Sequence, residues 1–237
     1  KTHDEALTEL TREVHAEIEH LESIGNALDI ALKEEDLVQI KEELIESGYI
    51  RRKGGSKKVK ITSRPFHYIS SDGFSIYVGK NNLQNEELTF KFAVGNDWWF
   101  HAKGRPGSHV IVRTEGRELP DASFEDAARL AAYYSTGRGQ EKVEIDYIEK
   151  KHVKKVAGAK PGFVIYHTNY SMVIDTDISG IRLAQDDMRQ KRRERPFVFR
   201  LFYRFQTLPN AFKHRYSAVL LKPLQCCTSK TAAVLHF

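Results

Sequence analysis

Two short strands and the turn between them are encoded by the stretch Asp97-Trp98-Trp99-Phe100-His101-Ala102-Lys103-Gly104-Arg105-Pro106-Gly107-Ser108-His109-Val110-Ile111-Val112-Arg113. Aromatic and β-branched residues favour strands over Trp98–His101 and Val110–Arg113. The glycines and the proline of Gly104–Gly107 favour a turn. The stretch therefore predicts an antiparallel hairpin near the middle of the chain.

Side chains alternate along an extended strand, so the first strand has two different faces. Trp98 and Phe100 share one face, which we expect to support the sheet from its core side. The other face carries Asp97, Trp99, His101 and Lys103. Because buried charges without partners are costly, we expect this second face to be in water, with Trp99 and His101 available to RNA bases. Spacing alone leaves another reading open, in which Trp99 covers a sheet edge and His101 hydrogen-bonds Asp97.

Apolar and polar residues also alternate in the segments before and after this hairpin, as in further strands. Residues 66–78 predict a second hairpin around Ser71–Gly73, and residues 143–148, 162–166 and 171–174 read as further strands. One main helix is expected to begin at Ser123, with Asp126 completing a capping box. Residues 66–185 are therefore expected to form an α+β domain, a mostly antiparallel sheet with one main helix.

A helical arm and a short helical unit are predicted before this domain. Over residues 1–33, Leu7, Val14, Leu21 and Leu28 recur every seven residues, as in half of an antiparallel coiled coil. An ordinary amphipathic helix is the alternative. Residues 34–65 predict a second helix that ends at Gly48, followed by a basic linker.

Charge is strongly segregated along the chain, whose net charge is +5. Residues 1–50 hold 4 Lys or Arg and 14 Asp or Glu, whereas residues 51–119 hold 13 and 6. Residues 186–237 hold 11 Lys or Arg and 3 Asp or Glu. They are expected to form a basic tail of unknown role, which is either an added tail or sequence read from the wrong frame. An acidic arm on a basic body favours a polyanion as partner, with an unevenly charged surface as the alternative.

Several function classes find little support in the sequence. No apolar run is long enough to span a membrane, no signal peptide is visible, and the adjacent Cys226 and Cys227 indicate a reducing compartment, so we expect a cytoplasmic protein. Asp97, His101 and His109 follow no metal-binding pattern, and a hydrolase using Asp97 and His101 has no support in their spacing. We expect no enzyme, no metal and no cofactor.

Three ordered motifs resemble a known family. They are Ile76 to Lys91, Asp97 to Ile111, and Gly158 to Tyr166, the last reading Gly-Ala-Lys-Pro-Gly-Phe-Val-Ile-Tyr. Together they resemble the C-terminal RNA-binding domain of the NFACT family over roughly residues 66–183. The resemblance implies a ribosome quality-control factor that binds stalled large ribosomal subunits through rRNA, recruits tRNA, and supports C-terminal alanine tailing of nascent chains. An older family name implies a different function, a surface adhesin that binds fibronectin or fibrinogen.

The expected RNA-contacting residues follow from the wet face and the turn. They are Trp99, His101, Lys103, Arg105, His109 and Arg113, with Asn81, Asn82 and Asn85 as a second group. Asp97 is expected to orient His101, and Trp98 and Phe100 to support the sheet. A second basic loop, Lys150–Lys160, would widen the phosphate-contacting surface.

Overall fold

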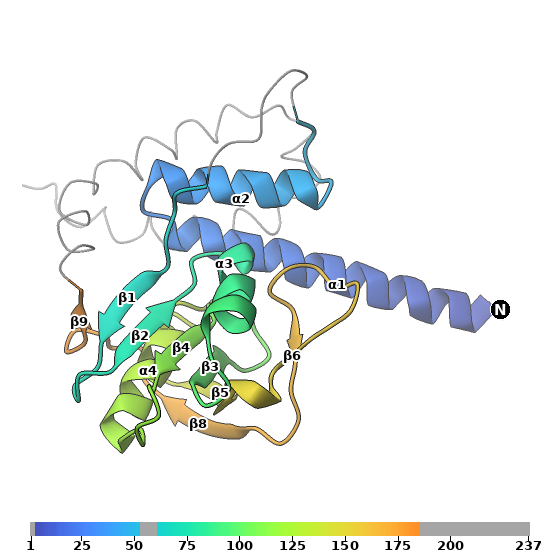
Figure 1. The fold of residues 1–237 in the computed structure, drawn as a ribbon. Helices are drawn as coiled ribbons and strands as arrows, with labels where there is room; N and C mark the ends of the chain where they lie inside the picture. The colour runs from blue at the N-terminus through green and yellow to red at the C-terminus, as the bar shows by residue number, and fades with distance from the viewer. Residues whose placement is uncertain (1–2, 53–60, 185–237) are drawn as a thin grey trace, which may run out of the picture.

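A seven-stranded antiparallel sheet forms the centre of the molecule, in the order β8-β5-β3-β4-β2-β1-β9 (Figure 1). The computed structural model that shows it describes residues 3–52 and 61–184. The strands of the sheet are β1 (Phe66–Ile69), β2 (Ser75–Val78), β3 (Trp98–Ala102), β4 (Val110–Arg113), β5 (Val143–Glu149), β8 (Tyr170–Ile174) and β9 (Arg182–Leu183). The other elements are the helices α1 (His3–Ile30), α2 (Glu34–Glu46), α3 (Asn82–Glu87) and α4 (Asp121–Tyr133), the π-helical turn η1 (Leu88–Phe92), the 3-10 turn η2 (Lys150–His152), and the small hairpin of β6 (Lys154–Lys155) and β7 (Val164–Ile165). The predicted α+β class is confirmed.

The hairpin predicted at the centre of the sequence forms the centre of the sheet. Trp99 on β3 lies opposite Ile111 on β4 and opposite Ile148 on β5. The hairpin of β1 and β2 also forms, and Gly73 takes a positive φ of 84° in its turn, where a side chain would be strained.

The main helix, α4, covers one face of this sheet. Its apolar residues pack against Phe100, Val110 and other buried residues of the strands. The predicted capping box is wrong: α4 begins at Asp121, and the Ser123 hydroxyl instead donates to Ser70 Oγ at 2.8 Å. Asp126 accepts from the amide of Ser71 at 2.8 Å. These two side chains therefore fasten the helix to the β1–β2 turn rather than cap it.

The other face of the sheet is covered as well, so the expectation of a wet face is wrong. The segment of α3 and η1 and the β6–β7 hairpin lie over it, and a second core forms beneath them. This core contains Leu88, Ala93, Trp99, Ile111, Ile148 and Val153. Sequence alternation sorted the β3 residues correctly onto two faces, but both faces are packed.

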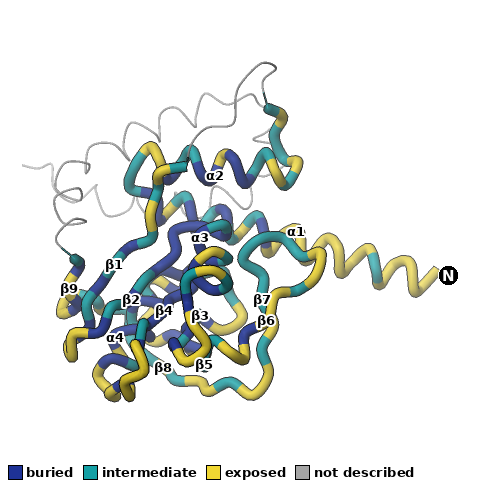
Figure 2. The backbone as a smooth tube through the Cα atoms, viewed as in Figure 1, coloured by how far each residue is buried: buried dark blue, intermediate teal, exposed yellow. Residues whose placement is uncertain are grey.

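Helices α1 and α2 pack against each other beside the sheet domain (Figure 1). Ile24, Ala27 and Ile40 form their shared core, and Gly48 ends α2 with a φ of 81°, as predicted. The N-terminal half of α1 extends away from the body, and its apolar side chains are exposed there (Figure 2). The coiled coil stays a prediction. Among the described residues, no helix is both long and apolar enough to cross a membrane. Residues 186–237, and with them both cysteines, lie outside the described part.

Candidate nucleic-acid interface

Trp99 is enclosed in the second core and has no exposed surface (0 % relative exposure). Leu88 and Val153 lie in the same cluster and belong to segments that come from either side of β3 in the sequence. A ring without accessible area cannot stack on a base. The predicted role of Trp99 in RNA stacking is therefore wrong, and its role is to fill the core between the sheet and its cover.

The two histidines predicted for RNA contact surround this tryptophan. The His101 and His109 ring centroids lie 5.6 and 5.1 Å from that of Trp99, and 5.4 Å from each other. Burial lowers the pKa of His101 to about 4. Burial, followed by the neighbouring His101, also holds the pKa of His109 well below its usual value. His109 is buried and its Nδ1 lies 2.8 Å from Thr89 Oγ1, so neither ring offers a positive charge to phosphate near neutral pH.

The carboxylate of Asp97 does not orient His101. Its two oxygens accept hydrogen bonds from the amides of Val94 (2.8 Å) and Thr114 (3.0 Å), and Oδ2 forms an ion pair with Arg113 Nε at 2.9 Å. The prediction fails because His101 is four residue steps along the chain from Asp97, roughly 13 Å in an extended strand. Asp97 instead fastens the loop before β3 to the end of β4.

Trp98 and Phe100 lie on the α4 side of the sheet, as expected for supporting residues. Phe100 is buried in the main core, and the Trp98 ring meets the Phe124 ring of α4 edge-on at 4.7 Å. These contacts attach the helix to the central strand.

The three asparagines predicted for RNA contact are buried beneath the helical unit. Asn81 caps α3 by accepting from the Gln84 amide at 3.0 Å. Asn82 Nδ2 donates to Glu43 Oε1 at 2.7 Å, and Asn85 Oδ1 accepts from the His109 amide at 2.9 Å. Their amides are used within the protein, so the prediction that they contact RNA is wrong for these buried groups.

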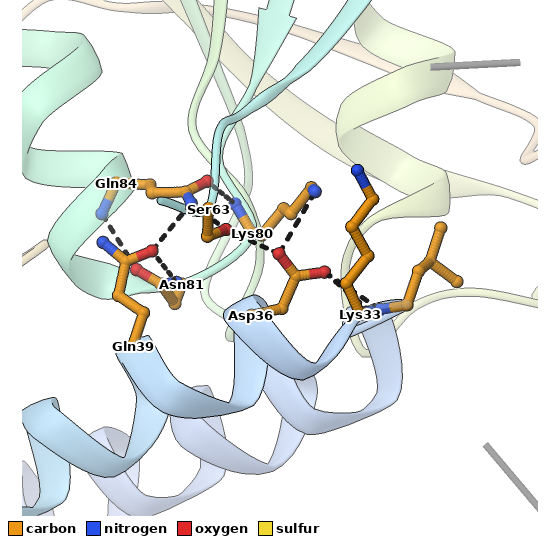
Figure 3. Close-up of polar contacts among 8 residues, drawn as sticks. Lys33, Asp36, Gln39, Ser63, Lys80, Asn81 and Gln84 are labelled. Atoms are coloured by element: carbon orange, nitrogen blue, oxygen red, sulfur yellow. Dashed lines mark hydrogen bonds and ion pairs between the residues drawn. The ribbon is translucent and has the colours of Figure 1, made fainter. Parts of the chain in front are cut away.

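A polar joint that was not predicted from the sequence connects α2 to the start of α3 (Figure 3). Lys80 Nζ lies 3.2 Å from Asp36 Oδ1 with both side chains buried, and Gln39 Oε1 accepts from Asn81 at 3.0 Å and from Gln84 at 2.8 Å. Asp36, Gln39 and Glu43 share one stripe of α2, since they are three and four residues apart. This polar stripe on the packed side of a helix was the available signal for a buried joint.

Lys103 and Arg105 keep the accessible side chains that the sequence predicts. Lys103 is exposed, and its Nζ lies 2.5 Å from Glu144 Oε1. Arg105 is partly exposed and donates from Nη1 to Gln140 Oε1 at 3.0 Å. Arg113 is one-quarter exposed beside Asp97. These three cations can reach a ligand, whereas Trp99 and His109 cannot.

The basic loop after β5 is also exposed. Lys151, His152, Lys154 and Lys155 are exposed, while Lys160 donates to the Tyr49 hydroxyl at 2.5 Å and is partly buried. Within the described ranges, no group of His, Cys, Asp and Glu could hold a metal ion. The exposed lysines make the surface of this loop basic.

Two family models match adjacent parts of the chain. Residues 64–168 match the family model described as NFACT protein RNA binding domain, and residues 1–63 match the model of the NFACT N-terminal and middle domains. The solved C-terminal structure of the fibronectin/fibrinogen-binding protein from Streptococcus suis superimposes with a TM-score of 0.69 at 41 % identity. The match covers 75 % of this chain and 72 % of that one. This chain belongs to the NFACT family.

Curated NFACT relatives are similar over the same region. The Rqc2 homolog RqcH of Streptococcus pneumoniae serotype 2 is 46 % identical over 172 residues, which is 72 % of this chain and 31 % of the relative. The Rqc2 homolog RqcH of Bacillus subtilis is 40 % identical over 172 residues, which is 71 % of this chain and 30 % of the relative. The chain thus spans about a third of the length of these relatives.

Proposed function

We propose that this chain is the RNA-binding part of a ribosome quality-control factor. In this role it holds rRNA of stalled large ribosomal subunits and tRNA, and it supports C-terminal alanine tailing of nascent chains. The observation that carries the proposal is the match of residues 64–168 to an RNA-binding domain within a chain 40 to 46 % identical to RqcH proteins. The exposed cations around the sheet are the groups that would meet phosphates.

The role we propose is binding rather than catalysis. Asp97 and His101, the pair that a hydrolase would need, do not meet, because Asp97 is engaged by Arg113 and two backbone amides. An RNA-binding role instead needs accessible positive charge, which Lys103, Arg105 and the loop after β5 supply.

Co-sedimentation with isolated large ribosomal subunits tests this proposal. The chain should pellet with the subunits at about 50 mM salt and be released at about 200 mM, because phosphate contacts weaken steeply with salt. The double variant Lys103→Ala, Arg105→Ala should pellet less, with an unchanged circular dichroism spectrum. Absence of pelleting at low salt would contradict the proposal.

A second candidate function is adhesion to fibronectin, because the solved relative from Streptococcus suis is described as a fibronectin/fibrinogen-binding protein. Surface plasmon resonance against immobilised fibronectin, with ribosomal subunits as a parallel ligand, separates the two functions. Saturable binding to fibronectin that exceeds binding to the subunits would favour adhesion.

A further inference from the structure

Three segments bring their cations together around buried Asp97. Its carboxylate pairs with Arg113 of β4 at 2.9 Å, and its backbone carbonyl accepts from the Lys150 amide at 2.8 Å. The Lys151 amide donates to the Gly95 carbonyl at 3.0 Å. We define the Asp97 rim as Arg113, Lys150 and Lys151, together with three cations next to them in the sequence of these segments: Lys91, which precedes the Arg113 contact Phe92, and His152 and Lys154 after Lys151.

The rim is held by packing as well as by hydrogen bonds. Val153 is buried in the second core and anchors the residues on both sides of it. The Arg113 guanidinium lies 4.7 Å from the centroid of the Phe92 ring. Phe92 is the residue that follows Lys91. Asp97 is fully buried, so it organises the rim without offering a negative charge to a ligand. The rim backbone is therefore fixed before any ligand binds, which lowers the entropy cost of binding.

Carboxylates offset only part of the charge of the rim. Glu149 pairs with Lys151 and lies 4.0 Å from His152 Nε2. In the described part of the chain, Lys150 and Lys154 have no carboxylate within ion-pair distance. These lysines are available to phosphate oxygens.

The Phe92 ring beside the rim is partly buried against the second core and lies 4.7 Å from the Arg113 guanidinium, so it is not an open stacking platform. Trp99 and His109 are enclosed. Of the tryptophan, tyrosine and phenylalanine rings in the described ranges, Tyr170 is the one classed as exposed, and it packs on Tyr147 on the α4 side of the sheet at a centroid distance of 5.5 Å. Sequence-tolerant binding of single strands depends on such platforms, whereas double-helical RNA is recognised through its backbone and shape.

We infer that the Asp97 rim binds the sugar-phosphate backbone of double-helical RNA rather than unpaired bases. This inference rests on the proposed RNA-binding function and adds to it a place and a class of RNA. The rim supplies fixed positive charge, which suits the fixed rows of phosphates on a duplex. An unpaired strand would gain no base stacking on an open aromatic ring here.

Fluorescence anisotropy with the whole chain tests the inference. The probes are an RNA hairpin with a stem of about 16 base pairs, the length that a duplex-binding domain spans, and oligouridine with the same number of phosphates. We expect the hairpin to bind at least tenfold more tightly. Equal or tighter binding of oligouridine would overturn the class of RNA, and absence of binding to both probes would overturn the proposed function itself.

Two double variants with matched charge reversals test whether the Asp97 rim is the binding surface. Lys150→Glu with Lys154→Glu should lower affinity for the hairpin at least tenfold and reduce the slope of log affinity against log salt by about 2. The control, Lys41→Glu with Lys142→Glu, makes the same change in net charge at exposed lysines outside the rim. Its affinity for the hairpin should fall much less. Equal losses in both variants, or a loss in Tyr170→Ala but none in the rim variant, would overturn the rim as the binding surface while leaving RNA binding in place. Unfolding curves confirm that each variant is folded.

Discussion

At the scale of single residues, the sequence distinguished sides of a strand but not what covers each side. Alternation along β3 correctly separated Trp99 and His101 from Trp98 and Phe100. The cover over Trp99 comes from Leu88 and Val153, which flank β3 at a distance in the sequence. No local pattern reports such long-range cover, so polar residues near Trp99 suggested a surface where the fold has a core.

Replacing Trp99 tests its structural role. Trp99→Ala should lower the free energy of unfolding by about 3–5 kcal/mol, because it removes a fully buried ring and leaves a cavity. Trp99→Phe should lower the free energy of unfolding less, as measured by urea denaturation. Its RNA affinity, measured by fluorescence anisotropy, should be unchanged. Tyr170→Ala, at an exposed ring, is the control and should cost less than Trp99→Ala. If folded Trp99→Phe lost RNA affinity, the ring would have a role in recognition.

Two imidazoles packed around Trp99, the buried His109 and the partly buried His101, make stability depend on pH. Burial lowers the pKa of His101 from 6.5 to about 4, so between these values the unfolded state binds a proton that the folded state does not. Stability should therefore fall as pH falls from about 7 to 5, and the pKa of His109 is shifted in the same direction. Urea unfolding at both pH values measures the loss, which should be smaller in His101→Gln. A wild-type stability that rises towards pH 5 would contradict this assignment.

At the scale of elements, the longer strands and α4 were predicted from the sequence, and α3 after β2 was not. The run Lys80–Glu87, rich in side-chain amides, contains α3. Asn81 is followed three residues later by Gln84, which is a start signal for a helix. The π-helical turn that follows, and the short β6 and β9, have no comparable signal because packing against the sheet determines them.

The joint between α2 and α3 gives a prediction at this scale. Lys80→Met should lower the free energy of unfolding by about 3–5 kcal/mol, since it leaves Asp36 buried without its counter-charge. The double variant Lys80→Met, Asp36→Asn should recover much of the loss, because a neutral amide needs no counter-charge and its oxygen can still accept from the Leu32 and Lys33 amides. Urea denaturation of the two variants and of the wild type provides the comparison. A double variant no more stable than Lys80→Met would show that the joint depends on more than this pair.

At the scale of the whole molecule, the joint fixes the base of a long helix to an RNA-binding body. His20 of α1 lies 3.1 Å from Glu43 of α2, and Glu43 in turn accepts from Asn82 of α3. Beyond this base the helix projects away from the sheet (Figure 1), with Leu7 and Val14 exposed. The seven-residue repeat predicted an arm before the body, but the buried contacts that join the two could be identified only in the structure.

The position of RNA on the body is tested most directly by photo-crosslinking. A thiouridine-containing RNA hairpin is crosslinked to the whole chain, and mass spectrometry identifies the attached peptides. We expect crosslinks in peptides that contain Arg113 and Lys150–Lys154. Crosslinks confined to β8 around Tyr170, or to α1, would contradict RNA binding at the Asp97 rim.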